Sequence, residues 1–409
     1  MQVLAAGSLR IQLWSYNYAP EPAGIAPVST TLARGLRSRG HHVEVVAAHP
    51  HYPEPHWGSR WRPYHELRDG IPVLRLPLWI GRETTAARIR QELSFTVALT
   101  GALPFLRRPD VVLAASPSFP ALFSAVAFAR MRRIPLVPWL HDVLPEGAIV
   151  TGHVEGGPVL RASRWLERTA YRTASRIVVL SAPFLANLRE KGVPEQKLSL
   201  IYDPATRQPA KPPELPSAKA VAGRARAICM GNIGHTQGLP PLVRAFSRSD
   251  AVRERDVRLV IVGTGVAAEE TRANIASDAV EMLGVVSDDE LERELQAATL
   301  AVVTQQYDGT EFNLPSKLMN YMRYGLPIIA AVNPASEAAR LVRESDCGWV
   351  VDSSDPDSFP RAIVDALSDP GELEGRARAG LAFAQANFSQ ETFAERFEAV
   401  LREAVERPL

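Results

Sequence analysis

The residues whose types and spacing suggest chemistry most clearly lie between Asp308 and Met322, where an acidic residue and a short loop precede a predicted helix. Lys317 and Asn320 are three residues apart, so they share one face of that helix. A lysine offers positive charge to a phosphate, and an asparagine can donate to and accept from a ribose hydroxyl. Lys317 is also the only lysine after residue 219. The pattern favours a nucleotide site, and the alternative is a helix start with solvated polar side chains.

Glycine-rich turns follow three of the predicted strands. They are Gly231-Asn232-Ile233-Gly234, Gly263-Thr264-Gly265, and a loop with Gly24 that leads into a helix start containing Ser29 and Thr30. Glycine lets a backbone approach a ligand, and free N–H groups in such turns suit an anion. The spacing matches neither a Walker A loop nor G-x-G-x-x-G, so a Rossmann dehydrogenase is not expected. The alternative for each turn is an ordinary strand-to-helix connection.

One histidine, His141, follows a predicted strand and is flanked by Asp142. In a doubly wound domain, the carboxyl end of a strand is where ligands bind. The alternative is a histidine satisfied by local hydrogen bonds. The acidic pairs Asp288-Asp289 and Asp355–Asp357 are interpreted as helix-start and loop residues, because aspartate is a common cap. We therefore predict no metal site.

Short apolar strands alternate with helical periods along the whole chain, which is typical of parallel sheets with crossover helices. The predicted strands are 11–14, 43–47, 73–76, 111–115, 136–139 and 177–180, then 227–230, 258–262, 280–283, 300–304, 327–330 and 348–351. The predicted helices include 30–39, 161–173, 239–247, 288–297 and 316–324, with two terminal helices over 372–406. The fold class is therefore α/β, with two doubly wound halves.

Five prolines between Pro204 and Pro216 separate the two halves. Proline lacks a backbone donor and fixes φ, so this stretch is neither a helix nor a central strand. We predict an N-terminal domain over 1–203, a stiff linker over 204–222 and a C-terminal domain over 223–388. A last helix over 389–409 would pack back on the N-terminal domain. Because open α/β sheets bind ligands at their carboxyl edges, we expect the chemistry between the domains.

Composition bounds the remaining possibilities. The chain has 409 residues and a formal net charge of +1, but residues 1–200 carry +10 and residues 201–409 carry −9. Two cysteines fit a reducing compartment. We see no apolar run long enough to span a bilayer and no secretory signal, so the expected location is cytoplasmic. No nucleic-acid partner is expected.

The order of motifs resembles the family 4 retaining glycosyltransferases of the GT-B fold over essentially the whole chain. The branch that it resembles most makes exopolysaccharides of the colanic-acid type. The matching segments are 18–27, 39–43, 50–53, 165–168, 176–181, 231–234, 262–265, 283–285, 315–317 and 325–327. The resemblance implies two Rossmann-like domains facing a cleft, a nucleotide diphosphate sugar as donor, and no metal or other cofactor. The acceptor would be a sugar or a lipid-linked sugar.

The resemblance also implies roles for individual residues. His141 would contact the transferring sugar, and Gly24 would lie near the donor phosphate and the acceptor. Gly234 would pack beside the pyrophosphate, and Leu283 with Gly284 would border the base. We take His141 and Glu311 as candidate catalytic residues. The donor-binding candidates are Gly24, Gly231, Asn232, Gly234, Gly263, Leu283, Gly284, Phe312, Asn313, Leu314, Lys317 and Asn320.

Three departures from the family pattern concern the donor. The position near the ribose, often glutamate, is Asn320, and Glu311 is one residue out of register. Asn232 and Thr236 (or Gln237) replace the basic pair that usually grips the pyrophosphate, and Lys317 would substitute for it. The end of the N-terminal domain reads Tyr202-Asp203-Pro204 instead of showing an asparagine.

Two alternatives stay open: a non-catalytic nucleotide-sugar-binding protein, and a sugar-nucleotide epimerase on the same fold. The basic N-terminal half also contains an apolar stretch, 95–106, among many arginines. A basic domain with an apolar helix can rest on an anionic membrane, so we predict peripheral contact on the inner face of the cell membrane. The alternative is solvated arginine on ordinary helices.

Overall fold

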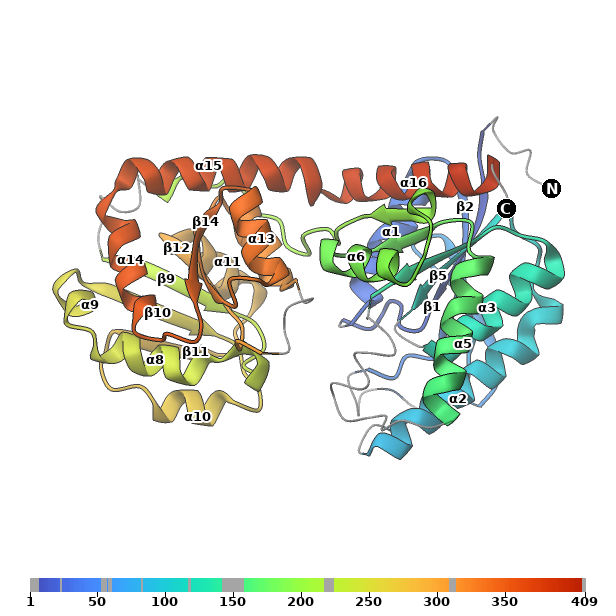
Figure 1. Cartoon of the computed structure of the whole chain (residues 1–409), viewed down its shortest axis with the longest axis horizontal. Coiled ribbons are helices and arrows are strands. Elements are labelled where there is room, and N and C mark those ends of the chain that lie inside the picture. Colours follow the sequence, from blue (N-terminus) through green and yellow to red (C-terminus); the bar gives the residue numbers. More distant parts are fainter. Residues whose placement is uncertain are drawn as a thin grey trace. The chain divides into compact units, whose positions relative to one another are not determined.

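The computed structural model describes residues 7–22, 24–52, 57, 61–81, 84–116, 119–141, 158–216, 224–308 and 314–406. The chain divides into two compact units, Met1–Asp203 with Gln390–Leu409, and Pro204–Ser389. Both units are shown in Figure 1. Each is built on its own sheet.

Within the described residues, the first unit holds an eight-stranded sheet in the order β3-β4-β2-β1-β5-β6-β7-β8. Neighbouring strands are parallel except for the β3–β4 pair. The strands are β1 (Arg10–Ser15), β2 (His42–Ala48), β3 (Tyr64–Arg68), β4 (Ile71–Leu76), β5 (Val111–Ser116), β6 (Leu136–Leu140), β7 (Ile177–Val179) and β8 (Leu198–Leu200).

Alternate side chains of each strand enter two different cores, because successive residues of a strand point to opposite faces. In β1, Trp14 joins one core and Leu13 the other. The Trp14 core is covered by α2 (Thr85–Ala102), η1 (Leu103–Phe105), α3 (Phe119–Arg132), α5 (Pro158–Thr173) and α6 (Ala182–Glu190). The Leu13 core is covered by α1 (Ala26–Ser38) and α16 (Gln390–Glu406). Helices thus cover both faces, as a parallel sheet requires.

The last helix, α16, is part of the first unit. Phe393 and Phe397 pack against Trp139 of β6, with ring centroids 5.8 and 4.9 Å away. Glu398 forms ion pairs with Arg39 and Arg402. Burial alone would raise the pKa of Glu398, but hydrogen bonds from the two arginines outweigh it and hold the pKa at about 2.

Within the described residues, the second unit holds a six-stranded parallel sheet in the order β11-β10-β9-β12-β13-β14. Its strands are β9 (Ala225–Met230), β10 (Val257–Val262), β11 (Val280–Gly284), β12 (Leu300–Thr304), β13 (Ile328–Val332) and β14 (Gly348–Asp352). Its helices are η3 (His235–Gln237), α8 (Leu239–Arg248), α9 (Asp250–Glu254), α10 (Ala268–Ala273), α11 (Asp288–Ala297), α12 (Ser316–Arg323), α13 (Glu337–Glu344), α14 (Ser358–Ser368) and α15 (Pro370–Asn387). The order reverses between β9 and β12, and ligands bind at such a switch point.

The structure confirms the α/β class and each predicted strand to within two residues at either end. The sequence analysis missed β8 and β3. For β3 a signal was present, because Asp69-Gly70, between β3 and β4, is the dipeptide that favours a two-residue hairpin. Both residues have positive φ, 51° and 72°. Residues 204–216 belong to the second unit, where the Arg207 and Ala210 N–H groups donate to side chains of α12 and α11.

Candidate functional site

The loops that follow β9, β10 and β11 are joined by backbone hydrogen bonds at the carboxyl edge of the second sheet. The N–H of Gly231 donates to Val262 at 2.8 Å, and that of Gly263 donates to Gly284 at 2.7 Å. The N–H of Ile233 donates to Thr264 at 2.9 Å. The structure therefore brings the predicted residues of these three loops to one edge.

Gly263 shows why this arrangement needs glycine. Its φ is +135°, and a Cβ at this position would lie 1.9 Å from the carbonyl oxygen of Gly231. Atoms cannot approach so closely, so any side chain would push the two loops apart. The glycine signal that the sequence analysis singled out is thus a packing requirement that brings the β9 and β10 loops together.

The β9 loop presents unused backbone donors. The N–H groups of Asn232, Gly234 and His235 have no hydrogen-bond acceptor among the residues that the structure describes. Asn232 and His235 are exposed, and η3 begins directly after Gly234. Adjacent N–H groups without acceptors form a concave site for an anion.

The β12 loop joins the same edge, since the N–H of Gln306 donates to Thr236 at 2.8 Å. Helix α12 follows this loop, and Tyr321 anchors it under β9. The Tyr321 hydroxyl accepts the N–H of Met230 at 2.7 Å, and its ring is fully buried. This hydrogen bond holds α12 in place at the switch point between β9 and β12.

Lys317 lies in the first turn of α12 and is partly exposed. None of the ion pairs or side-chain hydrogen bonds among the described residues involves its ammonium group. Within the described part of the chain, no acidic side chain neutralises Lys317, and α12 follows the loop that joins the β9 loop at this edge.

Asn320 is engaged inside the second unit. Its Oδ1 accepts the N–H of Arg207 at 3.0 Å, and its Nδ2 donates to the Thr206 hydroxyl at 3.2 Å. The residue is only 5% exposed. Lys317 and Asn320 lie on the same helix, but Asn320 holds the segment after Pro204 against α12. The sequence did not reveal this contact, because the partners are more than 110 residues apart.

Leu283 and Gly284 end β11, and Leu283 is partly exposed. A Cβ at Gly284 would meet no atom within 4 Å, so the space beside it is open. Val285 and Val266 follow on neighbouring loops and are 77% and 80% exposed. The sequence analysis did not single out these two exposed apolar side chains. Leu314 is partly exposed, and Glu311, Phe312 and Asn313 lie outside the described residues.

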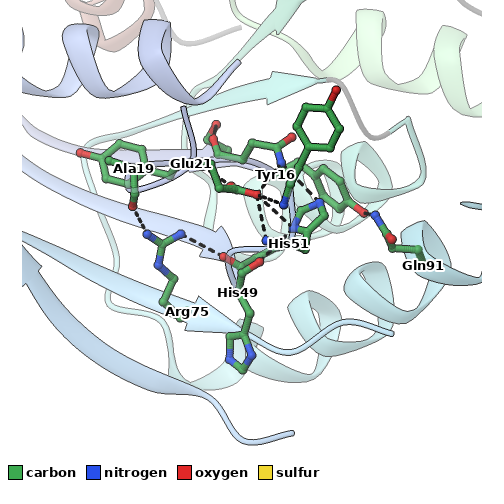
Figure 2. A network of polar contacts seen from close by, with 12 residues as sticks. Tyr16, Ala19, Glu21, His49, His51, Arg75 and Gln91 are labelled. Atoms are coloured by element: carbon green, nitrogen blue, oxygen red, sulfur yellow. Dashed lines mark hydrogen bonds and ion pairs between the residues drawn. The ribbon is translucent and has the colours of Figure 1, made fainter. Parts of the chain in front are cut away.

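A buried carboxylate organises the loop after β1 in the first unit, as Figure 2 shows. Glu21 accepts the N–H groups of Tyr18, His51 and Tyr52 at 3.1, 3.0 and 2.8 Å. It also accepts the amide Nδ2 of Asn17 at 3.1 Å and is 3% exposed. Glu21 thus holds the β1 and β2 loops together. The sequence analysis missed it, although both loops belong to the quoted family motifs.

Arg75 of β4 supports the same loops. Its guanidinium donates to the carbonyl oxygens of Ala48, at 3.0 Å, and Ala19, and to the Glu66 carboxylate at 2.9 Å. Tyr16 contacts the ring of His51, with centroids 4.8 Å apart (Figure 2). A small cavity at the carboxyl ends of β1 and β5 lies beside them, lined by residues such as Ser15, Tyr16 and Ala115.

Gly24 is exposed, has φ of +64° and stands just before α1. The hydroxyls of Ser29 and Thr30 have partners inside the first unit. Ser29 meets Ser15 at 2.8 Å, and Thr30 accepts the N–H of Ala19 at 3.2 Å. These contacts tie the start of α1 to β1 and to the loop after it, because Ser15 ends β1 and Ala19 lies in that loop.

His141 lies directly after β6, with its ring 4.5 Å from the ring of Trp139. Its Nε2 is covered and has no hydrogen-bond partner among the described residues. Burial lowers the pKa of His141 to about 3, so the imidazole is neutral near pH 7. Asp142 lies outside the described residues.

No group of three or more His, Cys, Asp or Glu side chains in the described part of the chain is placed to hold a metal ion. Asp288 forms an ion pair with Arg207 at 2.7 Å and begins α11. Asp355 and Asp357 lie just before α14. None of the helices that the structure describes is both long and apolar enough to cross a membrane.

Comparison with known proteins identifies the family of each half of the chain. A model of the glycosyl transferase 4-like domain matches residues 23–203, and a model of the glycosyl transferases group 1 matches residues 224–369. WcaI of Escherichia coli K12, assigned as a glycosyl transferase of colanic acid biosynthesis, is 24% identical over 354 residues. The alignment spans 81% of this chain and 86% of WcaI.

Two solved structures share the fold. Sucrose-phosphate synthase from Thermosynechococcus elongatus superposes with a TM-score of 0.68 at 19% identity, over 96% of this chain and 98% of that one. HepE from Anabaena in complex with UDP gives 0.67 at 16% identity, over 96% and 99%. The fold expectation is confirmed, and the two family models together account for most of the sequence. The chain therefore belongs to the GT-B glycosyltransferases of family 4 type, with a transferase 4-like domain followed by a group 1 domain.

Proposed function

We propose that this glycosyltransferase moves a sugar from a nucleotide diphosphate sugar to an acceptor hydroxyl with retention of configuration. The acceptor is a sugar or lipid-linked sugar in cell-surface polysaccharide or glycolipid synthesis. The assignment of WcaI to colanic acid biosynthesis supports the polysaccharide product, and the UDP bound to HepE supports a nucleotide donor. The two buried free cysteines suit reaction in the cytoplasm.

The observation that carries the proposal is the unused set of donors at the switch point of the second sheet. The N–H groups of Asn232, Gly234 and His235 come from the β9 loop, and Lys317 comes from the helix after β12. The β9 and β12 strands are neighbours. A pyrophosphate binds to such a combination of backbone donors and one charge, so Lys317 takes over from the missing basic pair.

The remaining donor contacts follow from the same edge. Leu283 and Gly284 border the base, with the apolar side chain of Val285 beside them. Glu311, Phe312 and Asn313 stay proposed contacts of the donor sugar. The ribose role of Asn320 is limited to its second amide N–H, because its oxygen already accepts the N–H of Arg207 and the Thr206 hydroxyl.

The reaction breaks the bond between the anomeric carbon and the donor phosphate oxygen. The acceptor oxygen forms the new bond on the same face, and its proton passes to the released phosphate. Negative charge grows on the nucleoside diphosphate as it leaves, and Lys317 with the β9-loop N–H groups stabilises that charge. The proposal assigns no step to a metal ion.

In the first unit, His141 would contact the transferring sugar as a neutral imidazole. Its low pKa suits a hydrogen-bonding role and excludes a positive charge on the ring near pH 7. The loop organised by Glu21 carries Gly24 and would form the acceptor side of the site.

The phosphate role is tested by calorimetry with UDP and GDP. Lys317→Ala should weaken binding of the preferred diphosphate roughly tenfold, because a charge-assisted hydrogen bond is lost. The matched control is Lys211→Ala, since Lys211 is an exposed lysine of the same unit. Turnover of the matching nucleotide sugar should persist in EDTA. If Lys317→Ala and Lys211→Ala bind the diphosphate with equal affinity, Lys317 does not contact the bound phosphates.

The missing basic pair also favours a second candidate, a protein that binds nucleotide sugars without turnover. Incubation of wild-type protein with the preferred donor, with and without sugar acceptors, separates the possibilities. Binding without transfer supports the hypothesis of a non-catalytic binding protein. A change in the donor sugar when no acceptor is present supports an epimerase. An α-linked product from an α-linked donor, identified by NMR, establishes retention.

A further inference from the structure

Helix α2 is apolar on two opposite sides. Phe95 and Leu99 point into the core of the first unit and are at most 3% exposed. On the other side, Ile89, Leu93 and Val97 are 52%, 49% and 72% exposed. With Ala86 they recur every three or four residues, so they share one outward face, here called the α2 stripe. A shallow groove runs along it, lined also by Arg90 and Ser94.

Two exposed tryptophans lie beside the α2 stripe. The rings of Trp61 and Trp79 meet edge to face with centroids 5.6 Å apart. Arg90 lies over the Trp79 ring at 4.7 Å, and the backbone N–H of Trp79 donates to the Ser94 hydroxyl of α2 at 2.8 Å. Trp61 is 64% and Trp79 49% exposed. Tryptophan favours the boundary between water and lipid, because its ring is apolar and its N–H is polar.

Arginines and further apolar side chains follow the carboxyl end of α2. Phe105 of η1 is 86% exposed, and Arg132 donates to the neighbouring Pro104 carbonyl at 3.2 Å. Met131 of α3 is 61% exposed. Arg107 and Arg108 follow η1 and are also exposed. The apolar surface thus continues past the end of α2 and is flanked by positive charge.

The helix layer around the stripe is basic as a whole. Helices α2, α3 and α5 lie side by side on the same core (Figure 1). Their sequences contain eight arginines and two glutamates. One of the glutamates, Glu167, is buried in an ion pair with Lys191 at 2.7 Å. On α5, Trp165 is 56% exposed between Arg164 and Arg168.

We propose that the α2 stripe, with Trp61, Trp79 and Phe105, is a membrane-docking surface that binds an anionic lipid bilayer. The apolar side chains would enter the acyl boundary while the arginines meet lipid phosphates, so one partner uses both features. A soluble polyanion would leave the apolar stripe in water. A second copy joined through the same face would bring its arginines against these arginines. The inference does not depend on the donor chemistry.

The test uses the full chain and sedimentation with vesicles. Wild-type protein should sediment with vesicles containing phosphatidylglycerol at low salt, and high salt should release it because exposed charges are screened. Vesicles of phosphatidylcholine alone should retain much less. Failure to bind phosphatidylglycerol vesicles at low salt overturns the proposal.

Two variants locate the contact. The double change Leu93→Ser with Val97→Ser should lower vesicle affinity roughly tenfold, since two side chains no longer enter the apolar boundary. Leu67→Ser is the matched control, because Leu67 is 70% exposed on β3 of the same unit. Melting temperatures verify folding. Equal affinity in the control and the double variant removes the stripe from the interface.

Fluorescence gives an independent readout. Lipids brominated on their acyl chains should quench the tryptophan emission of wild-type protein, and Trp79→Phe should reduce that quenching. Unchanged quenching would place Trp79 outside the bilayer boundary and contradict the proposal.

Transfer to a short water-soluble acceptor should be unaffected by the Leu93 and Val97 changes. If the wild-type protein transfers no sugar to any acceptor, that result contradicts the proposed function instead. Sedimentation equilibrium that shows a dimer lost in the double variant would assign the face to a second copy.

Discussion

Glu21 is the residue that fixes the shape of the first unit's loops. It accepts hydrogen bonds from three backbone N–H groups and one amide, and the Glu21 carboxylate is buried. Glu21→Gln places an NH2 group where these donors need an acceptor. An unsatisfied buried donor costs about 1–3 kcal/mol, so we expect that loss in the free energy of unfolding, together with a raised KM for the acceptor.

Urea unfolding and acceptor kinetics measure the two effects of Glu21→Gln. Glu44→Gln serves as control, since Glu44 is a partly exposed carboxylate on β2. The KM for the donor should stay close to the wild-type value. If Glu21→Gln lowers the free energy of unfolding but leaves the KM for the acceptor unchanged, these loops do not form the acceptor side of the site.

His141 gives the stability a pH dependence. Burial holds the pKa of His141 at about 3 in the folded state, below the usual 6.5. Between these values the unfolded chain takes up a proton that the folded chain does not, so stability falls as the pH drops below 6.5 and is unaffected above it. At about pH 5 the cost is about 2 kcal/mol.

His141→Phe removes that cost. The free energy of unfolding of the variant, relative to that of wild type, should therefore be higher at about pH 5 than at about pH 7.5. Urea denaturation at the two pH values measures the difference. An identical change in unfolding free energy at both values would mean that His141 titrates normally in the folded protein.

At the scale of elements, the contact between α1 and α16 depends on one small residue. A Cβ at Gly35 would lie 2.6 Å from the Cβ of Ala394. Gly35→Ala should therefore destabilise the protein by about 1–3 kcal/mol, despite the better helix propensity of alanine. Thermal unfolding with Gly375→Ala as control tests this, because a Cβ at Gly375 in α15 meets no atom within 4 Å.

The control should be neutral or stabilising, since alanine favours helix over glycine by roughly 1 kcal/mol. A Gly35→Ala protein as stable as the control would mean that α16 can shift away from α1 without loss of stability.

The contact between α1 and α16 is also strengthened by Glu398, whose ion pairs with Arg39 and Arg402 hold its pKa at about 2. That contribution is present above about pH 4.5 and is lost as the pH falls towards 2.

At the scale of the whole molecule, the structure changes the charge division that the linear sequence suggests. The first unit contains 27 basic and 20 acidic side chains, a net +7, and the second contains 19 and 25, a net −6. The difference from the +10 and −9 of the two sequence halves arises because α16 returns acidic residues to the basic unit. Glu403 of α16, for example, pairs with Arg176 at 3.2 Å.

The positive charge of the first unit is therefore partly neutralised on the side that α16 covers. The arginines of α2, α3 and α5 keep their charge on the helix layer that covers the other core. A net charge for the unit is consequently a poor guide to its partners. The proposed membrane surface depends on where the arginines and the α2 stripe lie together.

The sequence by itself determined the alternation of strands and helices, the glycine turns after β9 and β10 and the position of Lys317. These features are local: hydrophobic period, turn chemistry and residue type are all read within a few neighbouring residues. The hairpin of β3 and β4 could also have been predicted from the Asp69-Gly70 dipeptide. Family motifs added the glycosyltransferase class, because their order extends along the whole chain.

Only the tertiary structure decided which polar groups are already occupied. Asn320 is held by Arg207 and Thr206, and Glu21 is surrounded by donors from two loops. It also decided that α2 has an apolar face left outside the core. Such facts depend on contacts between distant segments, and no local pattern states which face a neighbouring element will cover.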